Sequence, residues 1–143
     1  FAMHKAIAVS ICGSMIALLA GCASLGMDDK SLARDETLGQ YGSALRFGDF
    51  GSAWQFIDPK VRAKHPLTDL DLARYKQVRV TDYNDDAGAV PISLTEVQQT
   101  VNIGLGNIHT QSERSIIDHQ IWRYDEKTKH WWLISGLPDI TQQ

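Results

Sequence analysis

The sequence predicts an α+β fold, in which helices from the N-terminal side pack on a curved antiparallel sheet of about four strands. Two observations lead to this prediction. Apolar residues recur at helical spacing through residues 32–57, and after Tyr75 they alternate with polar residues as in half-buried strands. Helices followed by a run of strands must pack on one face of the sheet, because both apolar surfaces are then buried.

The first helix is expected over residues 32–47. Gly48 favours a stop at its end, and Asp49 favours a new helix N-cap directly afterwards. The residues that share the apolar face of this helix are Leu38, Tyr41 and Leu45.

A second, shorter helix is expected to close at Asp58 and Pro59. Its apolar stripe consists of Phe50, Ala53, Trp54 and Ile57. A further helical turn is predicted at Thr68, because Thr68 and Asp71 have the spacing of a capping box.

Four strands are predicted after the helices. The first contains Val78 and Val80, and a polar turn at residues 84–88 ends it. The others are expected at residues 92–105, 115–124 and 130–137. Gly104, Gly106 and Asn107 are expected to break the second strand and lead into a hairpin loop.

The composition is that of an ordinary globular protein, with 43% hydrophobic and 22% charged residues in 143 positions. The formal net charge is −3, and it becomes −4 without residues 1–21, whose one charged residue is Lys5. An acidic domain lacks the clustered cations that nucleic acid requires, so we expect no nucleic-acid partner. Both cysteines, Cys12 and Cys22, precede the domain, which therefore has no internal disulfide.

The N-terminal segment has the anatomy of an export signal. His4 and Lys5 precede a mostly apolar run over residues 6–20, which is shorter than the roughly 20 residues that span a bilayer. The following residues, Leu-Ala-Gly-Cys at 19–22, resemble the lipobox of bacterial lipoproteins. This resemblance implies a diacylglycerol on the sulfur of Cys22 and cleavage directly before it.

The lipobox divides the chain into a signal peptide (residues 1–21), a lipidated tether (22–31) and one α+β domain (32–143). Two or three acyl chains hold a protein on a membrane, whereas one gives only marginal binding. Ala23 after the cysteine, by resemblance to lipoprotein sorting, implies the outer membrane, with the domain facing the periplasm.

A second resemblance concerns the domain itself. Residues 44–59, the two long predicted strands and the closing Trp-Trp-Leu-Ile at 131–134 resemble the NTF2-like superfamily, whose architecture is related to that of cystatins. The resemblance implies a cone-shaped sheet that wraps the first helix and can leave a cavity at its wide end. Members include isomerases, dehydratases and proteins without a known reaction; the enzymes generally place Asp, His or Tyr inside the cone.

Asp118 and His119 are the weak catalytic candidates. As neighbours on a predicted strand they point to opposite sides of the sheet, which argues against a dyad. Which of the two faces is the inner one stays open, because both carry apolar residues. Three other histidines, without carboxylates or cysteines at ligand spacing, are His65, His109 and His130. We therefore expect no metal site and no cofactor.

Aromatic residues are candidates for a ligand or partner surface. The residues proposed for it are Tyr75, Trp122, Arg123, Trp131 and Trp132. Large aromatics in a small domain more often belong to the core. Because Trp131 and Trp132 are adjacent on a strand, one is expected in the core and the other on an outer face.

Three functions remain open at this level. The leading hypothesis is a non-enzymatic envelope lipoprotein that binds an envelope protein or a small hydrophobic ligand. The second is an isomerase-like or hydratase-like enzyme with an acid–base pair inside the cone, formed by His119 or Asp118 and a tyrosine. The third is a structural subunit of an envelope assembly, which includes a homodimer.

Overall fold

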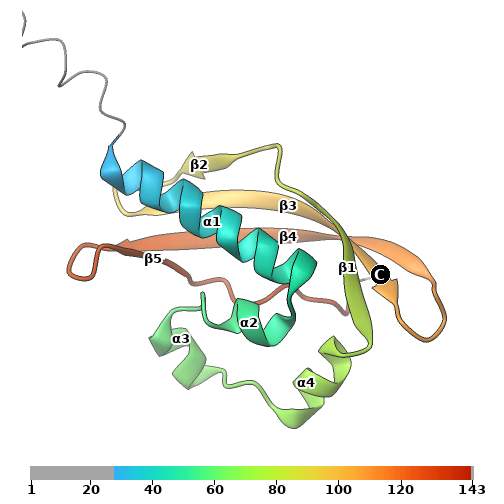
Figure 1. Ribbon diagram of the computed structural model, residues 1–143. Coiled ribbons are helices and arrows are strands. Elements are labelled where there is room, and N and C mark those ends of the chain that lie inside the picture. Colours follow the sequence, from blue (N-terminus) through green and yellow to red (C-terminus); the bar gives the residue numbers. More distant parts are fainter. Residues whose placement is uncertain (1–27, 143) are drawn as a thin grey trace, which may run out of the picture.

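The computed structural model describes residues 28–142 and confirms the α+β class (Figure 1). The signal segment, Cys22 and the first part of the tether lie outside the described residues. Four helices come first: α1 (Asp29–Phe47), α2 (Phe50–Trp54), α3 (Pro59–Lys64) and α4 (Asp69–Tyr75). The strands are β1 (Val78–Asn84), β2 (Ala89–Pro91), β3 (Glu96–Asn107), β4 (Glu113–Asp125) and β5 (His130–Leu133).

The sheet is antiparallel and curled, with β1, β3, β4 and β5 in that order. The short strand β2 pairs with β3 beyond the end of β1, so two separate strands share one edge of β3. A register shift between Val80 and Asp82 marks a bulge in β1. In Figure 1, α1 lies across one face of the sheet, while α2, α3 and α4 form an arc at its side.

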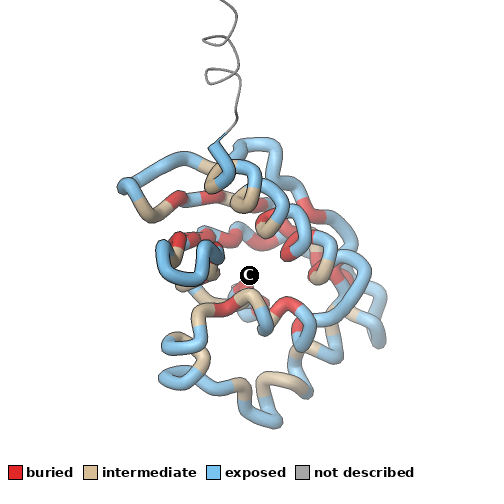
Figure 2. Tube along the Cα trace, turned by 60° about the vertical axis from the view of Figure 1, so that its left-hand side comes forward, coloured by how far each residue is buried: buried red, intermediate tan, exposed pale blue. Residues whose placement is uncertain are grey.

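The helix α1 brings one apolar face against the sheet. Asp28 caps its start, where its side chain accepts a hydrogen bond from the backbone N–H of Lys30. Tyr41 is fully buried, and its ring meets Trp122 of β4 edge-to-face at 5.3 Å between centroids. A second edge contact joins Tyr41 to Phe56 at 5.6 Å. Figure 2 shows buried positions running along the long strands and the helices that face them.

Two details of the helices differ from the prediction. The first helix begins at Asp29, three residues before the expected start, because Asp28 provides an N-cap within the predicted tether. The second helix ends at Trp54, before the expected stop at Asp58 and Pro59, and these two residues open a further helix, α3, with Asp58 as the N-cap and proline in the first turn.

The predicted break at Gly104 and Gly106 is wrong, because β3 runs through both to Asn107. The glycines instead allow β3 to pass close to the bulge of β1. A Cβ atom at Gly104 would lie 2.7 Å from Oγ1 of Thr81 and 3.2 Å from the backbone nitrogen of Asp82. Glycine here marks a close approach of two backbones within a sheet.

Between residues 28 and 142, no helix has the length and apolar character needed to cross a bilayer. The NTF2-like resemblance rests on the order of the elements and stays a prediction.

Two glycines of α1 offer a matched test of how tightly this helix packs. A Cβ atom at Gly42 would lie 2.8 Å from the ring of Tyr83, which is buried and held by a hydrogen bond from Gln120. Gly42→Ala should therefore lower the free energy of unfolding by about 1 to 3 kcal/mol. At Gly39 an added Cβ meets no atom within 4 Å. Because alanine is more favourable than glycine inside a helix, Gly39→Ala should raise the free energy of unfolding by up to about 1 kcal/mol.

Urea denaturation of both variants measures these two changes. Equal stability of the two alanine variants would contradict the close packing of α1 on Tyr83.

Candidate functional site

The alternation of β4 settles which of its faces is the inner one. Asp118 points inward and is 7% exposed, whereas His119 lies on the outer face, where its Nδ1 is 3.5 Å from Oγ1 of Thr100. The two candidates therefore lie on opposite sides of the sheet, as their adjacent positions predict. They do not form a dyad.

Asp118 belongs to a chain of buried polar side chains. The amide Nε2 of Gln120 donates hydrogen bonds to Oδ2 of Asp118 at 2.9 Å and to the hydroxyl of Tyr83 at 3.0 Å. The indole Nε1 of Trp122 donates to Oε1 of Gln120 at 3.1 Å. Gln120 thus occupies the centre of the chain and uses both ends of its amide.

Burial disfavours the charged form of the groups in this chain. It raises the pKa of the Asp118 carboxyl, against smaller opposing effects of the hydrogen bond from Gln120 and of His119. Burial likewise raises the pKa of Tyr83. A carboxyl with a raised pKa suits proton transfer, but here Gln120 stands between Asp118 and Tyr83, and both are nearly inaccessible.

A cleft of about 340 Å³ opens at the C-terminal end of α1, between α2, α4 and β1. Phe50 and Tyr75 stack within its wall, with ring centroids 4.4 Å apart and planes at 15°. The other apolar residues that line it are Leu45, Leu72, Val78 and Val80. The lining includes neither Asp118 nor Tyr83, so the cleft is separate from the buried polar chain.

The charged residues that line the cleft are three cations and one carboxylate: Arg46, Lys76, Arg79 and Asp49. Asp49 is engaged as the N-cap of α2, where it accepts a 2.6 Å hydrogen bond from the backbone N–H of Ser52. This hydrogen bonding lowers the pKa of Asp49. Within residues 28–142, none of the three cations has a carboxylate oxygen within 4 Å, so they are available to an anion.

Tyr75 lies where this cleft adjoins a second, more open cleft of about 680 Å³. The second cleft also includes Trp54, His65 and the segment 134–137. Tyr75 is half-buried, and burial followed by the charge of Asp71 raises its pKa. Tyr75 is thus a predicted surface residue that the structure does place at a cleft.

The other proposed surface residues lie apart from the cleft. Trp122 is fully buried and unavailable to a partner. Trp131 is also buried, and its Nε1 donates to the carbonyl of Lys30, while half-buried Trp132 stands beside His130 at 4.0 Å. The two adjacent tryptophans therefore differ in burial as predicted. Exposed Arg123 pairs with Glu96 at 3.0 Å.

The cations of the cleft were not singled out from the sequence. Arg46 lies in the last turn of α1, Lys76 follows α4, and Arg79 lies on β1. Their spacing has no local signature, because only the fold brings three separate elements to one opening.

No cluster of three or more metal-ligating side chains occurs in the described part of the chain. Comparison with protein families, curated proteins and solved structures finds no match to this chain.

The raised pKa of Asp118 predicts how stability depends on pH. The carboxyl of Asp118 binds its proton more tightly in the folded state than in the unfolded state. Its contribution to the free energy of unfolding is therefore largest below the pKa of the unfolded state and is lost as pH rises through the raised pKa of the folded state. Asp118→Asn removes the ionisation and keeps an acceptor for Gln120. We expect it to be more stable than the wild type at pH 7, by about 1.4 kcal/mol for each unit by which burial raises the pKa.

Urea denaturation from pH 3.5 to 8 tests this expectation. The advantage of Asp118→Asn should shrink toward the acid end of the range. Asp86→Asn, on an exposed turn, is the control. A constant difference between Asp118→Asn and the wild type across the range would contradict a raised pKa.

Proposed function

We propose that the chain is an envelope lipoprotein, anchored through Cys22, whose domain binds a small amphiphile with an anionic head group. The cleft beside Tyr75 carries this proposal, because it combines an apolar wall with cations that have no carboxylate partner within the described residues. The anchor is supported by the lipobox sequence, Leu-Ala-Gly-Cys at 19–22.

The chemistry of the cleft favours this class of ligand. Its volume lies near the lower end of the range for small-molecule sites, which is roughly 300 to 1,000 Å³. Burial of an alkyl chain against Phe50 and Tyr75 gains about 25 cal/mol per Å² of apolar surface. Arg46, Lys76 and Arg79 would orient the anionic end, although the chain as a whole is acidic.

An enzyme acting inside the sheet is less well supported. Its acid–base pair would be Asp118 and Tyr83, which Gln120 connects. Tyr41 and Trp122 fill the space between α1 and the sheet, and the cleft does not extend to either member of that pair. A structural role in an envelope assembly remains an alternative that the cleft does not specifically favour.

The anchor is tested by changing the cysteine of the lipobox. In Gram-negative cells, Cys22→Ala should move the protein from the membrane to the soluble envelope fraction, because the acyl chains are lost. Ser24→Ala, two residues along the chain, is the control and should stay with the membrane. Retention of Cys22→Ala on the membrane would refute the anchor.

Ligand binding is tested with decanoate, an anionic amphiphile, and the full chain carrying Cys22→Ala. Nuclear magnetic resonance titration should shift the backbone amides of Phe50, Tyr75 and Val78 first. Lys76→Gln and Arg79→Gln should each weaken binding about threefold to tenfold, equivalent to about 0.7 to 1.4 kcal/mol for one lost charge contact.

The matched control is Lys127→Gln, which removes a cation from the distant turn between β4 and β5 and should leave the affinity unchanged. Decanol should bind more weakly than decanoate. Equal affinities of decanoate for Lys76→Gln, Arg79→Gln and Lys127→Gln would contradict the proposed role of the cations.

A further inference from the structure

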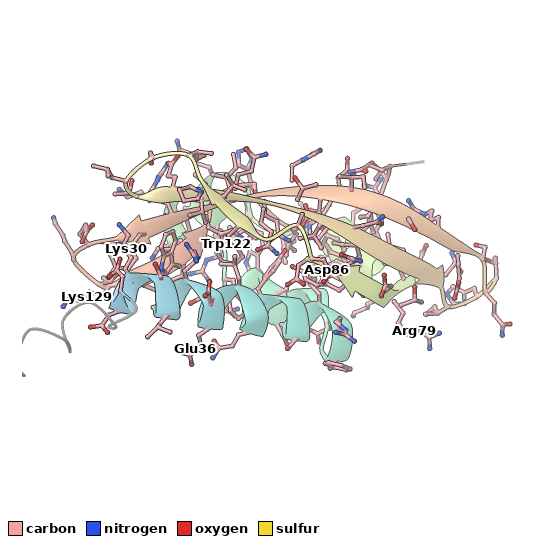
Figure 3. The ribbon with its side chains drawn as sticks, turned by 90° about the horizontal axis from the view of Figure 1, so that it is seen from above. Lys30, Glu36, Arg79, Asp86, Trp122 and Lys129 are labelled. Carbon is pink, nitrogen blue, oxygen red and sulfur yellow. The ribbon has the colours of Figure 1, made fainter. Side chains whose placement is uncertain are left out.

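One end of the domain gathers the start of α1, the loop between β2 and β3, and the turn between β4 and β5. Lys30 joins all three: its Nζ donates a 2.6 Å hydrogen bond to the carbonyl of Leu94 and lies 3.6 Å from Glu126. Its own carbonyl accepts from the indole of Trp131 at 2.9 Å. Figure 3 shows Lys30 and Lys129 at this end, with Arg79 of the cleft at the other.

Apolar side chains project into solvent at the same end. Leu94 is 94% exposed although its carbonyl is held by Lys30. Val90 and Ile92 are 58% and 49% exposed and line one shallow hollow of about 220 Å³. We refer to Val90, Ile92 and Leu94 as the apolar tip. Exposed apolar groups concentrated on a short segment indicate an interaction site.

The number of residues between Cys22 and α1 limits how far the start of α1 can lie from a membrane. Asp28 follows Cys22 by six residues, which reach at most about 21 Å when fully extended. The helix α1 has 19 residues and is therefore about 28 Å long. A lipid on Cys22 thus holds the start of α1, beside the apolar tip, within about 21 Å of the membrane. In a domain that contacts the membrane through this tip, the cleft at the far end of α1 lies about 28 Å further away.

The charges at this end indicate the kind of lipid. Three cations stand near four carboxylates here: Lys30, Lys127 and Lys129 against Asp28, Asp29, Asp125 and Glu126. No excess of positive charge is present to draw the domain to anionic lipids. The contact would rest on apolar insertion at the level of the head groups.

We propose that the apolar tip inserts into the head-group region of a zwitterionic bilayer and orients the domain with the cleft directed away from the membrane. This proposal rests on the anchor at Cys22. A second contact beside the lipid would fix the orientation of the domain, because the anchor already supplies a high local concentration of membrane.

The test uses the mature lipoprotein purified from membranes and reconstituted in phosphatidylcholine and phosphatidylethanolamine vesicles. Mass spectrometry first establishes whether Cys22 is acylated. Leu94→Cys then carries a nitroxide at the tip, and Ile108→Cys carries the same label as the control, since Ile108 is 52% exposed and follows the distant end of β3. Lipidation leaves no other free thiol, because Cys12 is removed with the signal.

The label at Leu94 should collide with oxygen roughly threefold more, and with a water-soluble nickel complex roughly threefold less, than the label at Ile108. Adding Val90→Ser and Ile92→Ser should reduce this difference. Exchange of a third of the lipid for phosphatidylglycerol should leave it unchanged.

Each opposite outcome overturns the proposal in a distinguishable way. An unacylated Cys22 overturns the anchor and the docking together. An acylated chain whose Leu94 label is as exposed to water as the Ile108 label overturns the docking alone. Burial that needs phosphatidylglycerol refutes the zwitterionic surface. Spin–spin broadening at Leu94 that grows with protein density shows a second copy on the tip instead of lipid.

Discussion

The edge-to-face contact between Tyr41 of α1 and Trp122 of β4 is the contact on which the rest of the arrangement depends. Both rings are fully buried, and together they fill the space between the helix and the curled sheet. Because α1 is fixed at its middle, its last turn ends beside α2, α4 and β1, where the cleft opens. The position of the cleft therefore follows from aromatic packing in the core, about one helical turn away from it.

The buried polar chain next to this contact gives the sheet a definite register. The amide of Gln120 makes hydrogen bonds with Asp118, Tyr83 and Trp122. The buried hydroxyl of Tyr41, by contrast, has no hydrogen-bond partner within the described residues. Polar groups without partners cost free energy when buried. A shift of β4 by one residue would bring its outer face inward and break the hydrogen bond from Gln120 to Tyr83 of β1, which is the bond of this buried polar chain that joins two strands. The bond therefore disfavours such a shift.

Much of the fold follows from local pattern. Leu38, Tyr41 and Leu45 predict the buried face of α1, and alternation predicts β1, β3, β4 and β5 closely enough to give the class. The inner face of β4 was not predictable, because Ile117 and Ile121 make the outer face apolar as well.

The features that the sequence alone did not reveal depend on contacts between distant segments. From the sequence, Gly104 is typical of a turn, but in the structure it lies within β3 next to the bulge of β1. The cations of the cleft share no spacing, since Arg46 and Arg79 meet only in the folded chain. Tyr75 was proposed for a ligand surface because it is aromatic, but its stacking on Phe50 depends on how α2 and α4 meet.

The divided edge of the sheet has a consequence for proteins crowded on one surface. An uninterrupted edge strand is a template for pairing with a neighbour, and attachment to a membrane would keep such neighbours at high density. Here the bulge in β1 and the brevity of β2, which ends at Pro91, leave no long run of free backbone groups on that side. The interrupted edge thereby guards against strand-to-strand aggregation.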